Sequence, residues 1–140
     1  MAGKILLEVV TPEKQLLSQQ VDEVIAPGSE GEFGVLPGHA YLLSTLRIGE
    51  LRYRVGDQTG HMAILWGYAE VTPTKVTVMA EIAEKAEDID VGRAQAAVEK
   101  AEQRLKAGGL PSELKAAEIS LEKARLRKKI AERARKTGHA

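Results

Sequence analysis

The stretch VGRAQAAVEKAEQRLKAGGLPSELKAAEISLEKA, residues 91–124, decides the C-terminal half of the fold. Its apolar residues recur at alternating spacings of three and four, which is the repeat of one helix face. The first stripe is formed by Val91, Ala94, Val98, Ala101 and Leu105, and the second by Leu114, Ala117, Leu121 and Ala124. Gly108-Gly109 separates them, and glycine readily adopts the left-handed conformation at a helix C-terminus. The segment therefore predicts two antiparallel helices joined by a short link, with Pro111 in the first turn of the second.

The seam between these two helices is predicted to be weak. Four of the nine stripe residues are alanine, and an alanine buries far less apolar surface than a leucine. Because each Å² of buried apolar surface contributes roughly 25 cal/mol, the alanines stabilise the seam only weakly. We therefore expect the hairpin to need support from the rest of the chain or from a partner. An element held so loosely is free to change position.

The first part of the chain predicts β-structure. Leu51–Val55 alternates apolar and polar side chains, and Lys75–Glu81 does so more loosely, as strands with one buried face do. Ile5–Val10 and Met62–Trp66 are short apolar runs that suit more deeply buried strands. Proline and glycine turn signals lie between these segments, and no helix is expected before about Glu84. We therefore predict an α+β protein, with an N-terminal antiparallel β-sandwich domain at residues 1–86 and a C-terminal antiparallel two-helix hairpin domain at residues 87–140.

Composition sets outer limits on function. The chain of 140 residues contains no cysteine, which excludes disulfides and thiolate chemistry. Its formal net charge of zero hides a split, because residues 1–90 carry 14 acidic and 7 basic side chains while residues 91–140 carry 6 and 13. This asymmetry indicates two regions with different electrostatic tasks. No apolar run approaches the roughly 18 residues of a membrane-spanning helix, so we expect any membrane connection to run through a partner.

The segment GSEGEFGVLPGHA, residues 28–40, is the main candidate for a binding site in the first region. It does not fit a phosphate cradle, because no lysine follows its glycines and Glu30 and Glu32 would repel phosphate. The only nearby potential metal ligands are Glu30, Glu32 and His39, and no two histidines of the chain share a short metal-binding spacing. No nucleophile can be recognised beside the paired carboxylates. A loop shaped by glycine and proline that presents charged tips favours docking to another protein.

Other classes of function fit parts of the sequence. A small cupin-like β-sandwich or barrel enzyme would use His39, His61 and glutamates as metal ligands. The basic segment KARLRKKIAERARK, residues 123–136, holds eight basic residues and one acid, and suits a solvated helix face, a nucleic acid or an acidic protein. Nucleic acid is disfavoured, because no aromatic residue follows Tyr68 to stack on bases.

Three motifs together resemble the epsilon subunit family of bacterial rotary ATP synthases: LLEVVTPEKQLLS at residues 6–18, GSEGEFGVLPGHA at residues 28–40 and IDVGRA at residues 89–94. The resemblance covers nearly the full chain. It implies a β-sandwich with a helical hairpin, and a noncatalytic subunit in the central stalk of a proton-translocating synthase. The sandwich is then expected to grip the gamma subunit and touch the polar loops of the c-ring. It also implies a peripheral location at the cytoplasmic face of the bacterial inner membrane.

The resemblance assigns individual residues to these contacts. The loop that faces the c-ring corresponds to Ser29, Glu30, Gly31 and Glu32. Positions against gamma correspond to His39 and Ser44. For His39, a turn histidine with only structural hydrogen bonds is the alternative interpretation.

The motif IDVGRA resembles the ATP-binding signature of the family, which implies ATP as a regulatory ligand, with its Mg²⁺ dependence open and no metal cofactor. The implied nucleotide contacts are Glu84, Ile89, Asp90, Arg93, Ala94 and Arg127. Members that bind ATP well carry arginines where this chain has Lys100 and Lys123, and lysine lacks the bidentate fork of arginine. The alternative interpretation is that Asp90 caps the helix and Arg93 lies on the surface.

The resemblance also gives the basic tail a partner. In this family the extended C-terminal helix can meet acidic segments of the alpha and beta subunits and stop the rotor, which inhibits ATP hydrolysis. The implied contacts are Arg125, Lys128, Lys129 and Arg133. The hairpin is then expected to switch between a compact state favoured by ATP and an extended state favoured by the acidic partner.

Overall fold

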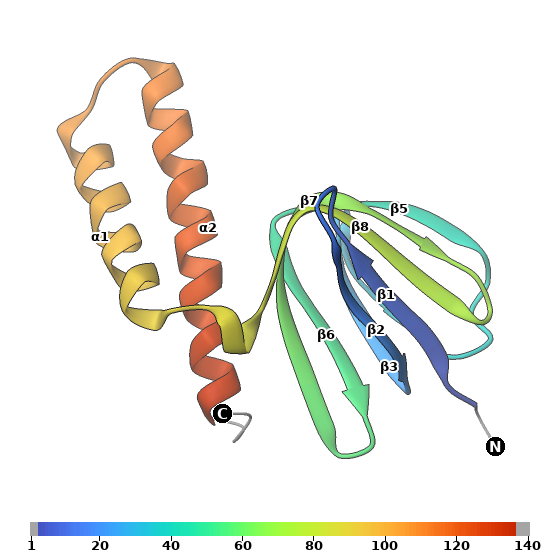
Figure 1. Ribbon diagram of the computed structural model, residues 1–140. Coiled ribbons are helices and arrows are strands. Elements are labelled where there is room, and N and C mark those ends of the chain that lie inside the picture. The colour runs from blue at the N-terminus through green and yellow to red at the C-terminus, as the bar shows by residue number, and fades with distance from the viewer. Residues whose placement is uncertain (1–2, 137–140) are drawn as a thin grey trace. The chain divides into compact units, whose positions relative to one another are not determined.

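The computed structural model of the protein describes residues 3–136 (Figure 1). By its contacts the chain divides into two compact units, a β unit up to Lys85 and a helical unit from Ala86 onward. The strands of the β unit are β1 (Ile5–Val10), β2 (Gln15–Val21), β3 (Glu23–Gly28), β4 (Gly31–Val35), β5 (Leu42–Leu46), β6 (Gly49–Val55), β7 (Gln58–Val71) and β8 (Lys75–Lys85). The helical unit contains the short 3-10 helix η1 (Ala86–Asp88) and the helices α1 (Val91–Ala107) and α2 (Pro111–Lys136).

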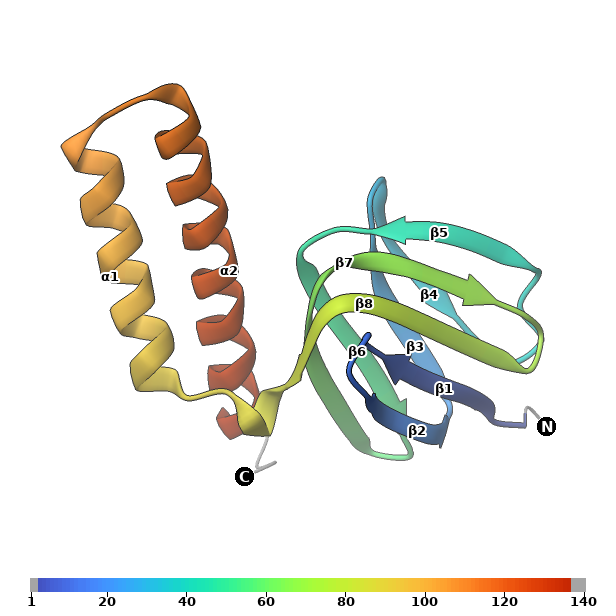
Figure 2. The same cartoon turned by 45° about the horizontal axis from the view of Figure 1, so that its top comes forward.

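The β unit is a sheet folded onto itself. Its strand order is β2-β1-β8-β7-β5-β3-β4, and β6 pairs with both β3 and β7 (Figure 2). The enclosed core is aliphatic, built on residues such as Leu7, Val24 and Leu51, and Phe33 and Tyr53 pack against it. The predicted sandwich is therefore confirmed, as are strands at all four predicted segments.

Two details of the β unit differ from expectation. The predicted antiparallel pairing fails at one place, because β1 and β8 run parallel, with Leu7 opposite Val76. A parallel pair needs a long connection between its strands, and here that connection is the remainder of the sandwich. In addition, the segment at residues 28–40 is only partly a loop. Gly31–Val35 forms β4, because pairing with β3 supplies backbone hydrogen bonds that override the low strand propensity of glycine.

Asp22, at the junction of β2 and β3, ties together distant parts of the β unit. Its carboxylate lies 2.7 Å from Lys4 Nζ and accepts a hydrogen bond of 2.7 Å from the backbone N–H of Gly56. Arg54 lies farther away, at 3.7 Å. The hydrogen bond from Lys4, followed by that from Gly56, lowers the pKa of the Asp22 carboxyl below its ordinary value of 3.8.

Replacing Asp22 with asparagine is expected to destabilise the β unit in a pH-dependent way. Because the folded-state pKa is lowered, the stabilisation is fully present above the ordinary value of 3.8 and is lost as the pH falls through the lowered pKa. The difference in unfolding free energy between the two proteins should therefore hold down to about pH 5 and shrink in stronger acid. Urea unfolding across this pH range measures it, with Asp57→Asn as the control in the nearby turn. A difference that persists unchanged at pH 2 to 3 would contradict the assignment.

The helical unit is the predicted antiparallel hairpin. The side chain of Asp90 caps α1 by accepting a hydrogen bond from the backbone N–H of Arg93, 3.0 Å away. Gly108, with φ +75°, follows the last residue of α1. Glu113 Oε1 accepts a hydrogen bond of 2.8 Å from the Leu110 backbone N–H at the start of α2.

The seam of the hairpin is narrow. Its buried cluster consists of Val98, Ala101, Leu121 and Ala124, with Leu105 packed against it. These residues belong to the two predicted stripes, and half of the buried four are alanine. Within the described residues, neither helix combines the length and the apolar character needed to span a membrane.

Candidate functional site

The turn between β3 and β4 presents the residues expected to face the c-ring. Ser29 and Glu30 form the turn, while Gly31 and Glu32 begin β4, and all four are exposed. The backbone N–H of Ser29 donates to the carbonyl oxygen of Thr45 over 2.9 Å, and the Thr45 hydroxyl donates to Ser29 Oγ over 2.8 Å. The structure therefore gathers the predicted residues at one tip, anchored on one side by β5.

His39 and Ser44 lie in and beside the following loop. His39 Nδ1 is 2.6 Å from the carbonyl oxygen of Ala40, and its backbone N–H donates to Leu36, so the histidine has a structural role in the turn. Ser44 lies within β5, opposite Ala69 of β7. Sequence reasoning missed two neighbours, Tyr41 and Leu43, which are 78% and 70% exposed. Large apolar side chains exposed on one area of a protein are typical of interaction surfaces.

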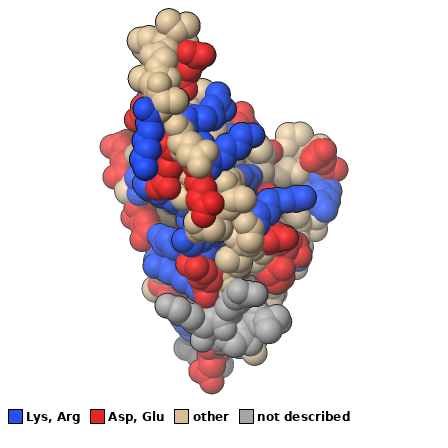
Figure 3. Space-filling model, turned by 90° about the vertical axis from the view of Figure 1, so that its left-hand side faces the viewer, with Lys and Arg blue, Asp and Glu red and all other residues tan. Residues whose placement is uncertain are grey.

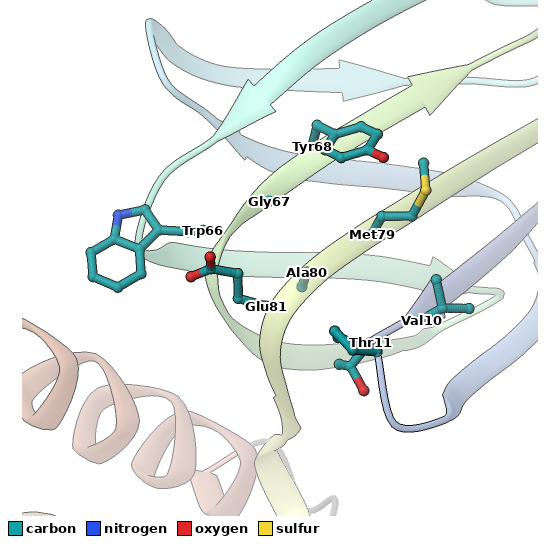
Figure 4. Close-up of a pocket in the computed structure, with 9 residues that line it drawn as sticks. Val10, Thr11, Trp66, Gly67, Tyr68, Met79, Ala80 and Glu81 are labelled. Carbon is teal, nitrogen blue, oxygen red and sulfur yellow. The ribbon is translucent and has the colours of Figure 1, made fainter.

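A second apolar area lies on the outer face of β1, β7 and β8. Tyr68 of β7 pairs with Met79 of β8, and Met79 pairs with Val10 of β1, so the three side chains cross the sheet in a row (Figure 4). They line a pocket of about 460 Å³, which Trp66 and Glu81 also line. Trp66 has φ +61°, a rare conformation for a bulky residue. Strain of this kind persists only where the surrounding structure holds it.

The helical unit contains a basic groove between α1 and α2. The groove has a volume of about 270 Å³ and is lined by Ala97, Lys100, Ala101, Arg104, Ser120, Lys123, Ala124 and Arg127. Small alanine side chains leave the space, and four cations and one hydroxyl border it. Arg93 lies on the same stripe of α1 as Ala97, Lys100 and Arg104, because spacings of 4, 7 and 11 residues return to one helix face. The groove therefore suits a polyanion such as a phosphate chain.

Of the predicted nucleotide residues, only Arg127 borders the groove. Beside it lie Lys100 and Lys123, at the positions where members that bind ATP well carry arginine, together with Arg104 and Ser120. Asp90 and Ala94 have structural roles as well, since Asp90 caps α1 and Ala94 is buried, with its N–H donating to the Asp90 carbonyl. Ile89 precedes the cap. Glu84 belongs to β8 and thus to the β unit, opposite Ala63 of β7.

The predicted partner contacts of the basic tail all lie on α2. Arg125 forms an exposed ion pair of 3.2 Å with Glu102 of α1, and Lys129 and Arg133 are exposed while Lys128 is half-buried. Arg135 and Lys136 belong to the last turn of α2. On the face shown in Figure 3, basic and acidic side chains are interspersed. The groove differs from this mixed surface, because all the charged side chains that line it are basic.

Comparison with known proteins identifies the family. Residues 4–86 match the family described as ATP synthase, Delta/Epsilon chain, beta-sandwich domain, and residues 87–135 match the corresponding long alpha-helix domain. The ATP synthase epsilon chain of Syntrophobacter fumaroxidans is 54% identical over 133 residues, covering 95% of this chain and 99% of that protein. The epsilon chain of Geobacter metallireducens is 50% identical over 134 residues, covering 94% and 96%.

Solved structures agree with this assignment. A chain in the mitochondrial ATP synthase of Euglena gracilis, solved as OSCP/F1/c-ring, superposes with a TM-score of 0.78 at 26% identity, over 89% of this chain and 79% of that one. A chain in the central stalk and c-ring structure from Tetrahymena thermophila has the same fold, with a TM-score of 0.59 at 17% identity. This chain belongs to the ATP synthase delta/epsilon chain family. Its relatives are noncatalytic stalk subunits of the synthase, so the predicted family is confirmed.

The alternative of a cupin-like metal enzyme finds no support. Both domains match a family of noncatalytic stalk subunits. His61 pairs with Glu50 over 2.7 Å, whereas His39 contacts a backbone carbonyl. Among residues 3–136, no three histidine, cysteine or acidic side chains cluster in a way that could hold a metal ion.

Proposed function

We propose that this chain joins the gamma subunit to the c-ring in the central stalk of a proton-translocating ATP synthase, and that its helical unit regulates ATP hydrolysis. The observation that carries the proposal is the division of the chain into two units, each with its own buried cluster, in a family of stalk subunits. A permanent grip and a movable regulator can then coexist in one chain. We place the complex at the cytoplasmic face of a bacterial inner membrane, where this chain is peripheral.

The β unit offers two surfaces for the stalk. Tyr41, Leu43 and Tyr68 are exposed, and tyrosine is among the residue types that contribute most of the binding energy at protein interfaces. They suit gamma, together with His39 and Ser44 nearby. The polar tip at residues 29–32 suits the polar loops of the c-ring, because its carboxylates can accept hydrogen bonds from a polar or basic loop.

The helical unit suits the regulatory task because its seam is weak. Two of the four residues in its buried cluster are alanine, so the pair gains little from apolar burial. The exposed cations of α2 at Arg125, Lys129 and Arg133 suit acidic segments of the alpha and beta subunits. Binding to those segments would favour an extended hairpin. A partner shifts the equilibrium between the compact and extended states only if it binds one of them more tightly than the other.

ATP is proposed as the ligand that opposes this extension. The groove brings Lys100, Arg104, Lys123 and Arg127 together, and cations that converge in this way suit a triphosphate. Arg93, at the N-terminal end of the same stripe, extends the basic surface. Asp90 and Ile89 would then lie toward the base and ribose, as the family signature implies.

Alanine at Arg93 or at Arg127 is expected to weaken ATP binding by the isolated chain. A hydrogen bond to a charged group contributes about 1.5–3 kcal/mol, so each loss should be roughly 10- to 100-fold in affinity. Calorimetric titration with and without Mg²⁺ measures it. Arg125→Ala is the matched control, because Arg125 lies on the same helix but pairs with Glu102 outside the groove. Heats of dilution alone from the unmodified chain would remove the ATP proposal.

The proposed function as a whole is tested by adding the chain to a synthase that lacks this subunit. The chain is expected to bind the complex and to lower its rate of ATP hydrolysis. Failure to bind would contradict the stalk assignment. Binding without any change in rate would contradict the regulatory half alone.

A further inference from the structure

A chain of polar contacts connects a buried histidine to the tip of the β3–β4 turn. His61 Nδ1 lies 2.7 Å from Glu50 Oε2, and the two side chains are 7% and 3% exposed. The other carboxylate oxygen, Glu50 Oε1, accepts a hydrogen bond of 3.3 Å from Arg52 Nη1. Arg52 Nη2 in turn donates to Glu32 Oε1 over 3.4 Å. One guanidinium therefore bridges a buried carboxylate and an exposed one.

The sheet explains why these residues meet. Glu50 and Arg52 are two apart on β6 and so lie on the same face, and Arg52 is directly opposite His61 of β7. Arg52 is also opposite Ile25 of β3, the strand that pairs with β4, where Glu32 lies opposite Pro27. Arginine suits this position because its planar fork carries two terminal nitrogens that can serve two acceptors.

We propose that Arg52 is a positioning residue that holds Glu32 ready for the c-ring, with Glu50 and His61 fixing Arg52 from the interior. The inference rests on the proposed contact between residues 29–32 and the c-ring. A free glutamate loses rotamer entropy when a partner orders it, and a side chain already held in place loses less. Arg52 contacts Oε1, and a carboxylate has a second oxygen with which to accept from a partner.

The test measures the affinity of the full chain for a synthase from which this subunit has been removed. Glu32→Gln and Arg52→Gln are each expected to weaken binding by roughly fivefold, in the range of coupled neighbouring residues. The double variant should bind no more weakly than Glu32→Gln alone, because Arg52 acts through Glu32. Arg52→Lys should recover only part of the affinity, since an ammonium group lacks the fork. Arg54→Gln is the matched control, two residues along β6 and paired with Asp22 and Glu23 instead.

The outcomes separate this inference from the function on which it rests. If Glu32→Gln weakens binding and Arg52→Gln does not, the inference is wrong and the c-ring contact stands. If neither does, both are wrong. The inference would also be overturned if Arg52→Gln weakened binding by the same factor in the unmodified chain and in the Glu32→Gln chain. Full affinity of the Arg52→Lys chain would overturn it as well. Thermal unfolding of each variant identifies any loss of fold. If Arg52→Gln does not fold, the affinity of the folded Arg52→Lys chain tests the inference instead.

Discussion

Replacement of Gly67 with alanine is expected to lower the free energy of unfolding of the β unit by roughly 3 kcal/mol or more. Gly67 has φ +148°, a conformation that residues with a Cβ rarely adopt. A Cβ at this position would overlap the carbonyl oxygen of Met79 and approach the Cα of Ala80 to 2.8 Å. Those atoms are backbone of β8, paired with β7 at this point, so they cannot move aside as a side chain could.

Gly31→Ala separates the clash from the backbone strain. Gly31 has a similar φ of +134°, but a Cβ there would meet nothing within 4 Å. Urea unfolding can follow the fluorescence of Trp66, the single tryptophan of the chain, which belongs to β7 of the β unit. Gly67→Ala should lose clearly more stability than Gly31→Ala. Equal losses would mean that conformational strain, and not contact with β8, determines the effect.

Local sequence patterns predicted the elements whose periodicity is strong. The spacing of Val98, Ala101, Leu121 and Ala124 predicted the hairpin seam, because a helix face repeats whatever its surroundings. Strands such as Gln15–Val21 were not predicted, because their polar residues break the alternation of apolar and polar side chains. Pairing with neighbouring strands determines their structure instead. The parallel pair of β1 and β8 joins residues about seventy apart in sequence, which no local pattern reports.

The candidate sites show the same limit. The spacing of Arg104 from Arg93 and Lys100 could have predicted that it shares their helix face. That Arg104 lines the same groove as Ser120 depends on how α1 and α2 pack against each other. The bridge from Arg52 to Glu32 depends on β6 lying beside β3. Motif resemblance identified the family, and its assignment of residues 29–32 to a partner contact stays a prediction. It did not identify the residues that hold the tip in place.

Removal of the helical unit is expected to have the largest functional effect. A chain that ends at Asp88 keeps all eight strands of the β unit and its core, so it should still bind the synthase. It lacks α1, α2 and the cations that are proposed to meet the alpha and beta subunits. Effector couplings of 1–3 kcal/mol change an equilibrium by roughly 5- to 150-fold. We therefore expect the full chain to inhibit ATP hydrolysis by about fivefold or more relative to the shortened chain.

The rate of ATP hydrolysis, measured on one preparation of synthase lacking this subunit, tests the central claim most directly. The rate is measured with a saturating concentration of the full chain and, separately, with a saturating concentration of the shortened chain. Competition between the two chains for the synthase shows that both bind at the same place. We expect strong inhibition by the full chain, relief of that inhibition at high ATP concentration, and no inhibition by the shortened chain. Identical rates with the two chains, both shown to be bound, would contradict it.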